Sequence, residues 1–332
     1  MKILNANEYI NERLVIKPVT KTMLSGMRRY RYYPKTKKEL ESLIMERVSN
    51  EGANCDLNDI DVSKLTSLNA VFFNVKFNGD ISLWDVRNVT DIDQLFCYSD
   101  FNGDISKWDV SNVVTMLGTF SNCKFNGDIS KWNVSNVKNM GSLFSENRWF
   151  KGDISKWDVS NVENMSSMFR ESYFDGDISK WNVSKVNNMS YMFCDSKFDS
   201  DISKWNVGEV KDMSNMFKRS EFNGDISNWN VSSVEDMERM FESTWRFNGD
   251  LSRWDVSNVK NMSEMFRGAV SFDCDISDWN VSNVETMYCM FRNSCFNKDI
   301  SKWNLESLKN WYMMYAASPM VRNKHKQAKK EN

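Results

Sequence analysis

An aspartate stands four residues before each of ten tryptophans, from Asp80 to Asp299, and this row is the most regular chemical feature of the chain. Carboxylates repeated at one position could bind Ca²⁺, or each could accept hydrogen bonds from the backbone N–H groups of its own turn. One carboxylate per repeat makes a poor oxygen cage. We therefore expect the turn role, with a row of calcium sites as the alternative, and we expect no metal centre and no cofactor.

Polar side chains also stand directly before and after the tryptophans. Five consecutive repeats have lysine before the Trp, and the same repeats have Asp or Asn after it. The neighbours of an inward-pointing strand residue point outward, so we predict an exposed face that binds an acidic protein or a glycan. Its residues are Lys107, Lys131, Lys156, Lys180 and Lys204 with Asp109, Asn133, Asp158, Asn182 and Asn206. A solvated face, in which each lysine pairs with a neighbouring aspartate, is the alternative.

Two further tryptophans, Trp149 and Trp245, lie outside the regular positions, in segments that differ in length between copies. Exposed tryptophan is enriched at binding hot spots, which makes both residues candidates for partner binding. Packing over the edge of the fold is the alternative.

Catalytic chemistry is disfavoured by composition. The only histidine, His325, lies in a Lys-rich C-terminal segment, so the repeats have no imidazole for a Ser-His or Cys-His pair or for a His-ligated metal. The seven cysteines include no CxxC pair, which favours reduced thiols over a zinc site. No P-loop or GxGxxG motif appears. We predict no catalytic residues and no enzyme activity.

A repeat positions all of these residues. It is marked by tryptophans spaced 24 or 25 residues apart, namely Trp84, Trp108, Trp132, Trp157, Trp181, Trp205, Trp229, Trp254, Trp279 and Trp303. A fixed period of this size predicts a solenoid, and a degenerate copy upstream brings the total to about eleven coils. Recurring Phe, Met, Val and Trp positions are expected to fill the core.

Each copy predicts one short strand and one short helix. The apolar positions of ISKWDVS are typical of a strand centred on Trp-Asp-Val. After it, the spacing of Val162, Met165, Met168 and Phe169 predicts about two helical turns. The expected fold class is therefore α/β, a leucine-rich-repeat-like solenoid with one strand and one helix in every coil and a helical N-terminal cap.

The two ends differ from the repeats, which cover residues 53–316. Residues 1–52 form a basic region in which Thr36 and Glu39 match a capping box, so residues 37–49 are predicted to be an amphipathic helix that caps the first coil. Its segment MRRYRYY would suit nucleic acid or an acidic partner, with a structural subdomain as the alternative. We expect residues 317–332 to be a basic, disordered tail.

The pattern IxxWDVSNVxNMSxMF, preceded by FNGD, resembles the BspA-like leucine-rich-repeat family in its mycoplasma-type branch of surface proteins. The resemblance covers about residues 53–316. It implies a horseshoe-like solenoid with strands on one face, often used for adhesion or protein binding. Surface members of that family carry export or anchor signals, and none is evident in this sequence.

These observations predict a monomeric, non-enzymatic scaffold for protein–protein interaction. A net charge of −2 argues against a uniformly basic nucleic-acid binder, and no 18-residue apolar run predicts a membrane span. A surface adhesin, and a nucleic-acid or anionic-surface binder that uses the basic ends, are alternatives. The lack of a signal peptide predicts a cytoplasmic location if the chain is complete, whereas the family resemblance implies the cell surface.

Overall fold

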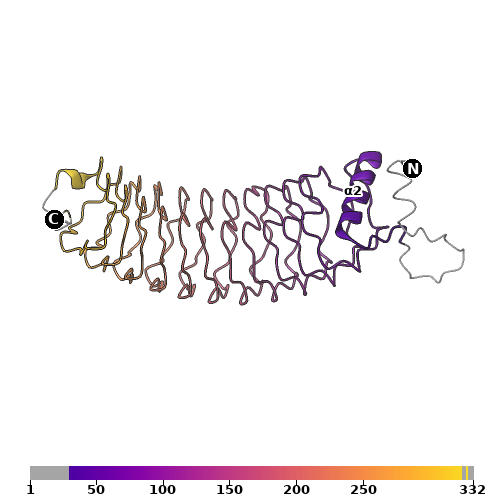
Figure 1. Cartoon of the computed structure of the whole chain (residues 1–332), viewed down its shortest axis with the longest axis horizontal. Helices are drawn as coiled ribbons and strands as arrows, with labels where there is room; N and C mark the ends of the chain where they lie inside the picture. The colour runs from indigo at the N-terminus through magenta and orange to yellow at the C-terminus, as the bar shows by residue number, and fades with distance from the viewer. Residues whose placement is uncertain (1–29, 324–326, 328–332) are drawn as a thin grey trace, which may run out of the picture.

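The computed structural model describes residues 30–323 and 327, and in this part the chain winds into one curved stack of coils (Figure 1). From Asp56 onward, parallel bridges join residues 24 or 25 positions apart, so each repeat forms one coil beside the next. Helix α2, Lys37–Glu51, lies at the N-terminal end of the stack, and the 3₁₀ helix η1, Pro319–Val321, lies at the C-terminal end. The predicted repeat is therefore confirmed.

Helix α2 caps the N-terminal end of the core. The Thr36 hydroxyl accepts a hydrogen bond from the N–H of Glu39 at 3.2 Å, which satisfies one of the free donors of the first turn. Leu40, Leu43 and Ile44 are buried in the same core cluster as the first coils. The capping helix predicted over residues 37–49 is confirmed, and it extends two residues further.

The predicted C-terminal tail is only partly described. Helix η1 lies inside it, and Met320 of this helix is fully buried. The rest of the tail, apart from residues up to 323 and Gln327, lies outside the described residues, as do residues 27–29 of the segment MRRYRYY. Residues 30–33 of that segment are described.

The strand predicted at Trp-Asp-Val is wrong. The N–H of Trp157 donates to the carbonyl of Ile154, three residues earlier, so a tight turn occupies this place, and the other nine copies repeat it. Within residues 30–323, parallel pairing consists of isolated bridges, chiefly one per coil in the column from Ser67 to Asn310. That part of the chain contains no sheet.

The helix predicted in each coil is also wrong. The N–H groups of Met165, Ser167, Phe169 and Glu171 donate to carbonyls of the next coil at 2.7–3.0 Å, so they are not available for bonds along a helix axis. Ser167 and Glu171 have φ of 55° and 53°, a left-handed conformation that interrupts a right-handed helix. Other coils have positive φ at the same two positions. The α/β prediction therefore fails, because the coils are built from successive tight turns.

Two phenylalanine columns and one tryptophan column fill the core, together with the methionines. One Phe lies 12 residues after each Trp except Trp303, which has Tyr315 at that position, and the other Phe lies seven residues before each Trp. The phenylalanines of both columns are 0–1% exposed. Where the columns meet, their rings stack 4.0–4.5 Å apart, as Phe96 does on Phe101. The predicted core positions are confirmed.

The spacing of the rings explains both the curvature and the missing strand. Successive rings lie 5.5–5.9 Å apart in the column of Phe120 but 6.0–6.5 Å apart in the column of Phe125. Strand pairing needs about 4.8 Å, and the wider side departs further from this spacing. Within residues 30–323 the aspartate row on that side has one backbone bridge, between Asp56 and Asp80. Side chains bridge the wider side: the indole N–H of Trp157 donates to the carbonyl of Ile129 at 3.1 Å.

We predict that Gly118→Ala lowers the free energy of unfolding by about 1 kcal/mol, because Gly118 has a φ of 62° that alanine adopts only with strain. An added Cβ would meet nothing closer than 3.5 Å, so the loss comes from the backbone alone. Gly208→Ala is the matched control, since its φ is outside the left-handed range and other coils carry serine there. Urea unfolding checks both variants, and an equal effect of the two would contradict the left-handed turn.

Candidate partner-binding face

The predicted binding residues form one exposed surface, which we name the Lys–Asx face. All ten are exposed, and they lie in five successive coils: Lys107, Lys131, Lys156, Lys180 and Lys204, with Asp109, Asn133, Asp158, Asn182 and Asn206. The face therefore exists as an accessible surface, although turns rather than strands carry it.

Each lysine of this face lies near the aspartate three residues before it. Hydrogen bonds from the hydroxyl and N–H of Ser106 lower the pKa of Asp104, and the charge of Lys107 adds a smaller effect in the same direction. The other four coils show the same effect of the lysine on its aspartate. Each lysine therefore has a neighbouring aspartate of opposite charge in its own coil, as the alternative of a solvated face expects. The lysines themselves stay exposed and accessible to a partner.

The Asp and Asn residues of the face have a structural role in their own coils. One side-chain oxygen of each accepts a hydrogen bond from the N–H two residues on, at 3.1–3.2 Å, as Asp158 does from Ser160. This local turn fixes the side chain at the surface. A partner would therefore meet a preorganised row of polar groups.

The ten-membered aspartate row also caps turns. In every copy one carboxylate oxygen accepts a hydrogen bond from the N–H of the serine two residues later, at 2.8–3.0 Å, as Asp153 does from Ser155. The predicted turn role is confirmed. Among the described residues no group of three or more His, Cys, Asp or Glu side chains is placed to hold a metal ion.

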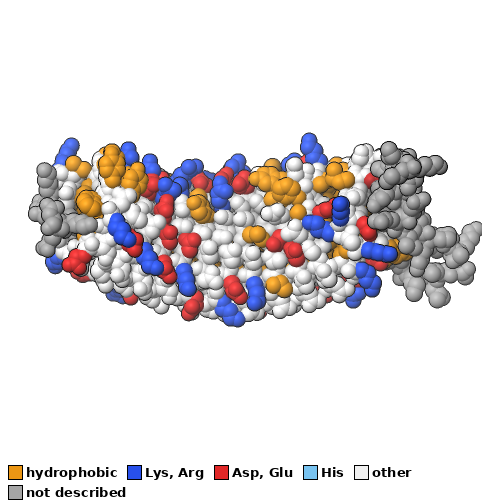
Figure 2. All heavy atoms as spheres, in the orientation of Figure 1, with side chains coloured by type: hydrophobic (Ala, Val, Ile, Leu, Met, Phe, Trp, Pro, Cys, Tyr) orange, Lys and Arg blue, Asp and Glu red, His pale blue; other side chains and the backbone are white. Residues whose placement is uncertain are grey.

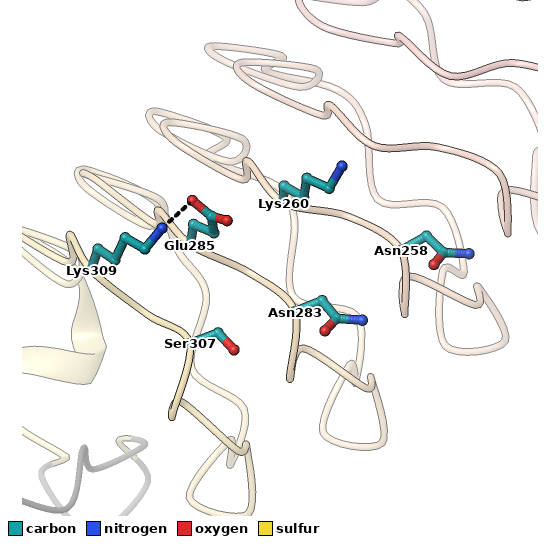
Figure 3. Close-up of a pocket in the computed structure, with 6 residues that line it drawn as sticks. All are labelled: Asn258, Lys260, Asn283, Glu285, Ser307 and Lys309. Carbon is teal, nitrogen blue, oxygen red and sulfur yellow. Dashed lines mark hydrogen bonds and ion pairs between the residues drawn. The ribbon is translucent and has the colours of Figure 1, made fainter.

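A shallow polar groove lies near the C-terminal end of the stack, beyond the coils of the Lys–Asx face (Figure 3). Lys260, Glu285 and Lys309 stand at one position of successive coils, and Lys309 pairs with Glu285 at 2.7 Å while Lys260 pairs with Glu235 at 2.6 Å. Asn258 and Asn283 donate to carbonyls of the preceding coil at 2.7 Å. This row of alternating charges was not predicted from the sequence, although lysine and glutamate alternate there at the position six residues after Trp.

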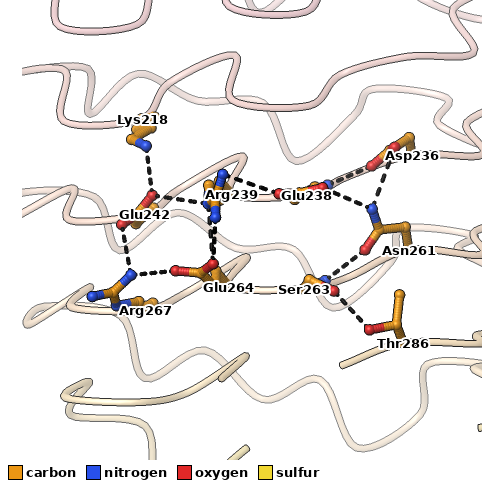
Figure 4. Close-up of polar contacts among 10 residues, drawn as sticks. All are labelled: Lys218, Asp236, Glu238, Arg239, Glu242, Asn261, Ser263, Glu264, Arg267 and Thr286. Atoms are coloured by element: carbon orange, nitrogen blue, oxygen red, sulfur yellow. Dashed lines mark hydrogen bonds and ion pairs between the residues drawn. The ribbon is translucent and has the colours of Figure 1, made fainter. Parts of the chain in front are cut away.

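An ion-pair network lies on the side of the stack where backbone bonds join the coils (Figure 4). Glu264, only 3% exposed, contacts the guanidinium groups of Arg239, at 2.6 Å, and of Arg267. Burial alone would raise the pKa of Glu264, but the two arginines outweigh it and lower the pKa. Lys218 and Glu242 extend the network at 2.9 Å. All the charges of this network are paired, which indicates a structural role.

Trp149 and Trp245 are 59% and 57% exposed, so the alternative that they pack over the coil edge is wrong. Both lie between the two phenylalanine columns and not on the Lys–Asx face. They remain candidates for a separate contact.

The lowered pKa values of the aspartate row predict acid-sensitive stability. Nine row members, including Asp80 and Asp104, have pKa values below the ordinary value of 3.8, chiefly because serine N–H and hydroxyl groups bond the ionised form. A group with a lowered folded-state pKa stabilises fully above its unfolded-state pKa and loses that contribution as the pH falls through the folded-state pKa. We expect urea unfolding to show a steep loss of stability below about pH 4.

Asp104→Ala should lower the free energy of unfolding at pH 7 by about 0.5–1 kcal/mol, because the N–H of Ser106 loses its acceptor at an exposed site. Asp104→Asn is the control, since it keeps an acceptor oxygen, and it should lose less. Equal losses in the two variants would contradict the turn role.

The repeats match a known protein family. A family model described as "Mycoplasma protein of unknown function, DUF285" matches residues 42–150, 116–221, 142–244 and 218–328. The four matches overlap and together run through nearly all the coils. No curated protein matches the chain, and no solved structure matches it. Within the described residues, no helix combines the length and hydropathy needed to cross a membrane.

Proposed function

The chain belongs to the DUF285 family of Mycoplasma proteins of unknown function, and we propose that it is a non-enzymatic scaffold that binds a protein partner through the Lys–Asx face. The observation that carries the proposal is the row of five exposed lysines at one position of five successive coils. A partner with regularly spaced acidic groups would complement this row.

The rigidity of the face supports a binding role. Each lysine stands beside a tryptophan that is only 3–4% exposed and whose indole is bonded to the preceding coil. The adjoining Asp and Asn side chains are fixed by turns. A face that is ordered before binding loses little conformational entropy when the partner docks.

The charges of the face favour an acidic partner, but they also limit how strongly it can bind. The lysines are the cationic groups of the face, but the aspartate row lies beside them and reduces their potential. Exposed ion pairs contribute at most about 1 kcal/mol each. Binding by several lysines together would therefore be additive, sensitive to salt and faster at low ionic strength.

The test is the triple variant Lys131→Glu, Lys156→Glu and Lys180→Glu. We expect at least ten-fold weaker binding of the partner, isolated with the unaltered chain from native lysate, and no fall in the melting temperature, because all three residues are exposed. Surface plasmon resonance and thermal unfolding give the two readouts.

The matched control reverses three exposed lysines elsewhere on the stack, Lys76, Lys151 and Lys211. It changes the net charge by the same amount and should bind the partner almost normally. Equal weakening by both triple variants would show a nonspecific charge effect, and unchanged binding by the first would reject the face as the site.

A surface adhesin is the second candidate function. It is favoured by the family match to Mycoplasma proteins and by the resemblance of the repeat to BspA-like surface proteins, which remains a prediction. Fractionation of cells that express the native gene would distinguish a surface location from a cytoplasmic one. Binding through the basic ends is a third possibility that involves segments largely outside the described residues.

A further inference from the structure

Exposed aromatic rings line one edge of the stack. Phe73, Tyr98, Trp149, Tyr173 and Trp245 are 44–59% exposed, and each lies between the two phenylalanine columns of its repeat. Figure 2 shows hydrophobic side chains gathered in separate groups along the upper edge, with charged side chains between them. We name this row the aromatic edge.

The rings of the aromatic edge fall into three groups. Phe73 and Tyr98 pack edge to face with ring centres 6.0 Å apart. Trp149 and Tyr173 occupy two successive coils, and Trp245 lies three coils beyond Tyr173. Four coil steps of about 6 Å put Trp149 and Trp245 roughly 24 Å apart. An extended ligand could therefore contact two or three groups at once.

Hydrogen bonds hold the backbone at both tryptophans of this edge. Trp149 lies two residues after a buried asparagine, Asn147. The side-chain oxygen of Asn147 accepts a hydrogen bond from the backbone N–H of Trp149 at 2.9 Å. The guanidinium of Arg246 lies 5.7 Å from the ring centre of Trp245, and the carbonyl of Trp245 accepts the hydroxyl of Ser271 at 2.6 Å. Exposed aromatic rings of this size suit flat apolar surfaces.

Ion pairs lie between and beside the rings of the aromatic edge. Asp100 pairs with Lys124 at 2.7 Å between the first and second groups of rings, and Lys197 pairs with Glu221 between the second and third. The arginines beside the tryptophans are paired as well, Arg148 with Glu171 and Arg246 with Asp199. The edge thus offers aromatic faces separated by hydrogen-bonding ion pairs, in which the charges of these residues compensate each other.

We propose that the aromatic edge binds an uncharged glycan chain, at a site separate from the Lys–Asx face. A sugar ring has an apolar C–H face that stacks on an aromatic ring and a rim of hydroxyls that hydrogen-bond to charged side chains. The alternation of rings and ion pairs matches this chemistry. A peptide that buries apolar side chains would instead meet the ion pairs Asp100–Lys124 and Lys197–Glu221 and desolvate them.

The experiment titrates the full chain with two uncharged probes, cellohexaose and hexa-N-acetylchitohexaose, and with heparin as the charged comparison. Because the ten core tryptophans are 3–4% exposed, a change in tryptophan fluorescence would report chiefly on Trp149 and Trp245 of the edge and on Trp311, which is exposed elsewhere. We expect at least one uncharged hexaose to give a saturable change that is the same at 50 mM and 500 mM salt.

Calorimetry on variants locates the site, since removing the indoles also removes their fluorescence. Trp149→Ala with Trp245→Ala should weaken binding at least ten-fold, and Trp149→Phe with Trp245→Phe should keep most of it. The control, Tyr191→Ala with Tyr312→Ala, removes exposed aromatic rings outside the edge and should bind normally.

Failure of both hexaoses to bind, binding of heparin alone, or equal binding by the double alanine variant would each overturn the proposal. Loss of the protein partner in the double alanine variant would overturn it too, because it would assign the edge to a protein interface. The triple lysine variant should bind the hexaose normally, so this outcome is independent of the proposed function.

Discussion

Aromatic stacking between coils is the constraint on which the rest of the structure depends. The Phe and Trp rings of successive coils lie in register. Ring spacing is 5.5–5.9 Å on the side where backbone bonds join the coils and 6.0–6.5 Å on the wider side, which departs further from the roughly 4.8 Å of paired strands. The backbone groups there still need partners, because unpaired buried groups are costly. Indole, amide and carboxylate side chains supply them, as Trp157, Asn136 and Asp153 illustrate. The repeated polar residues are therefore as structural as the repeated apolar ones.

This division of roles leaves few positions free to vary. Columns that face inward or cap turns are nearly constant from coil to coil, whereas the residues directly before Trp and those between the two Phe columns differ. Both proposed surfaces occupy such variable positions: the lysines of the Lys–Asx face and the rings of the aromatic edge. Because bonds to neighbouring coils hold the backbone beneath both surfaces, recognition by either would depend on side-chain identity rather than on a change of shape.

Much of this organisation could be predicted from the sequence. The period, the buried columns, the capping helix at Thr36 and the turn role of Asp153 all follow from residue type and spacing. The strands and helices could not, because apolar spacings of two, three and four residues also fit successive tight turns. The decisive feature is the positive φ at residues such as Ser167 and Glu171. Serine and glutamate seldom adopt a positive φ, so the sequence does not indicate it at these positions. The exposure of Trp149 could not be predicted either, since a residue in an inserted segment can project into solvent or pack against the coil.

Hydrogen exchange of the indole N–H groups, followed by NMR, tests the central claim most directly. If side chains join the coils on the tryptophan side, the ten column indoles are bonded to buried carbonyls and should exchange slowly, whereas Trp149 and Trp245 should exchange at the rate of exposed indole. Column indoles that exchange as fast as Trp149 and Trp245 would contradict the account.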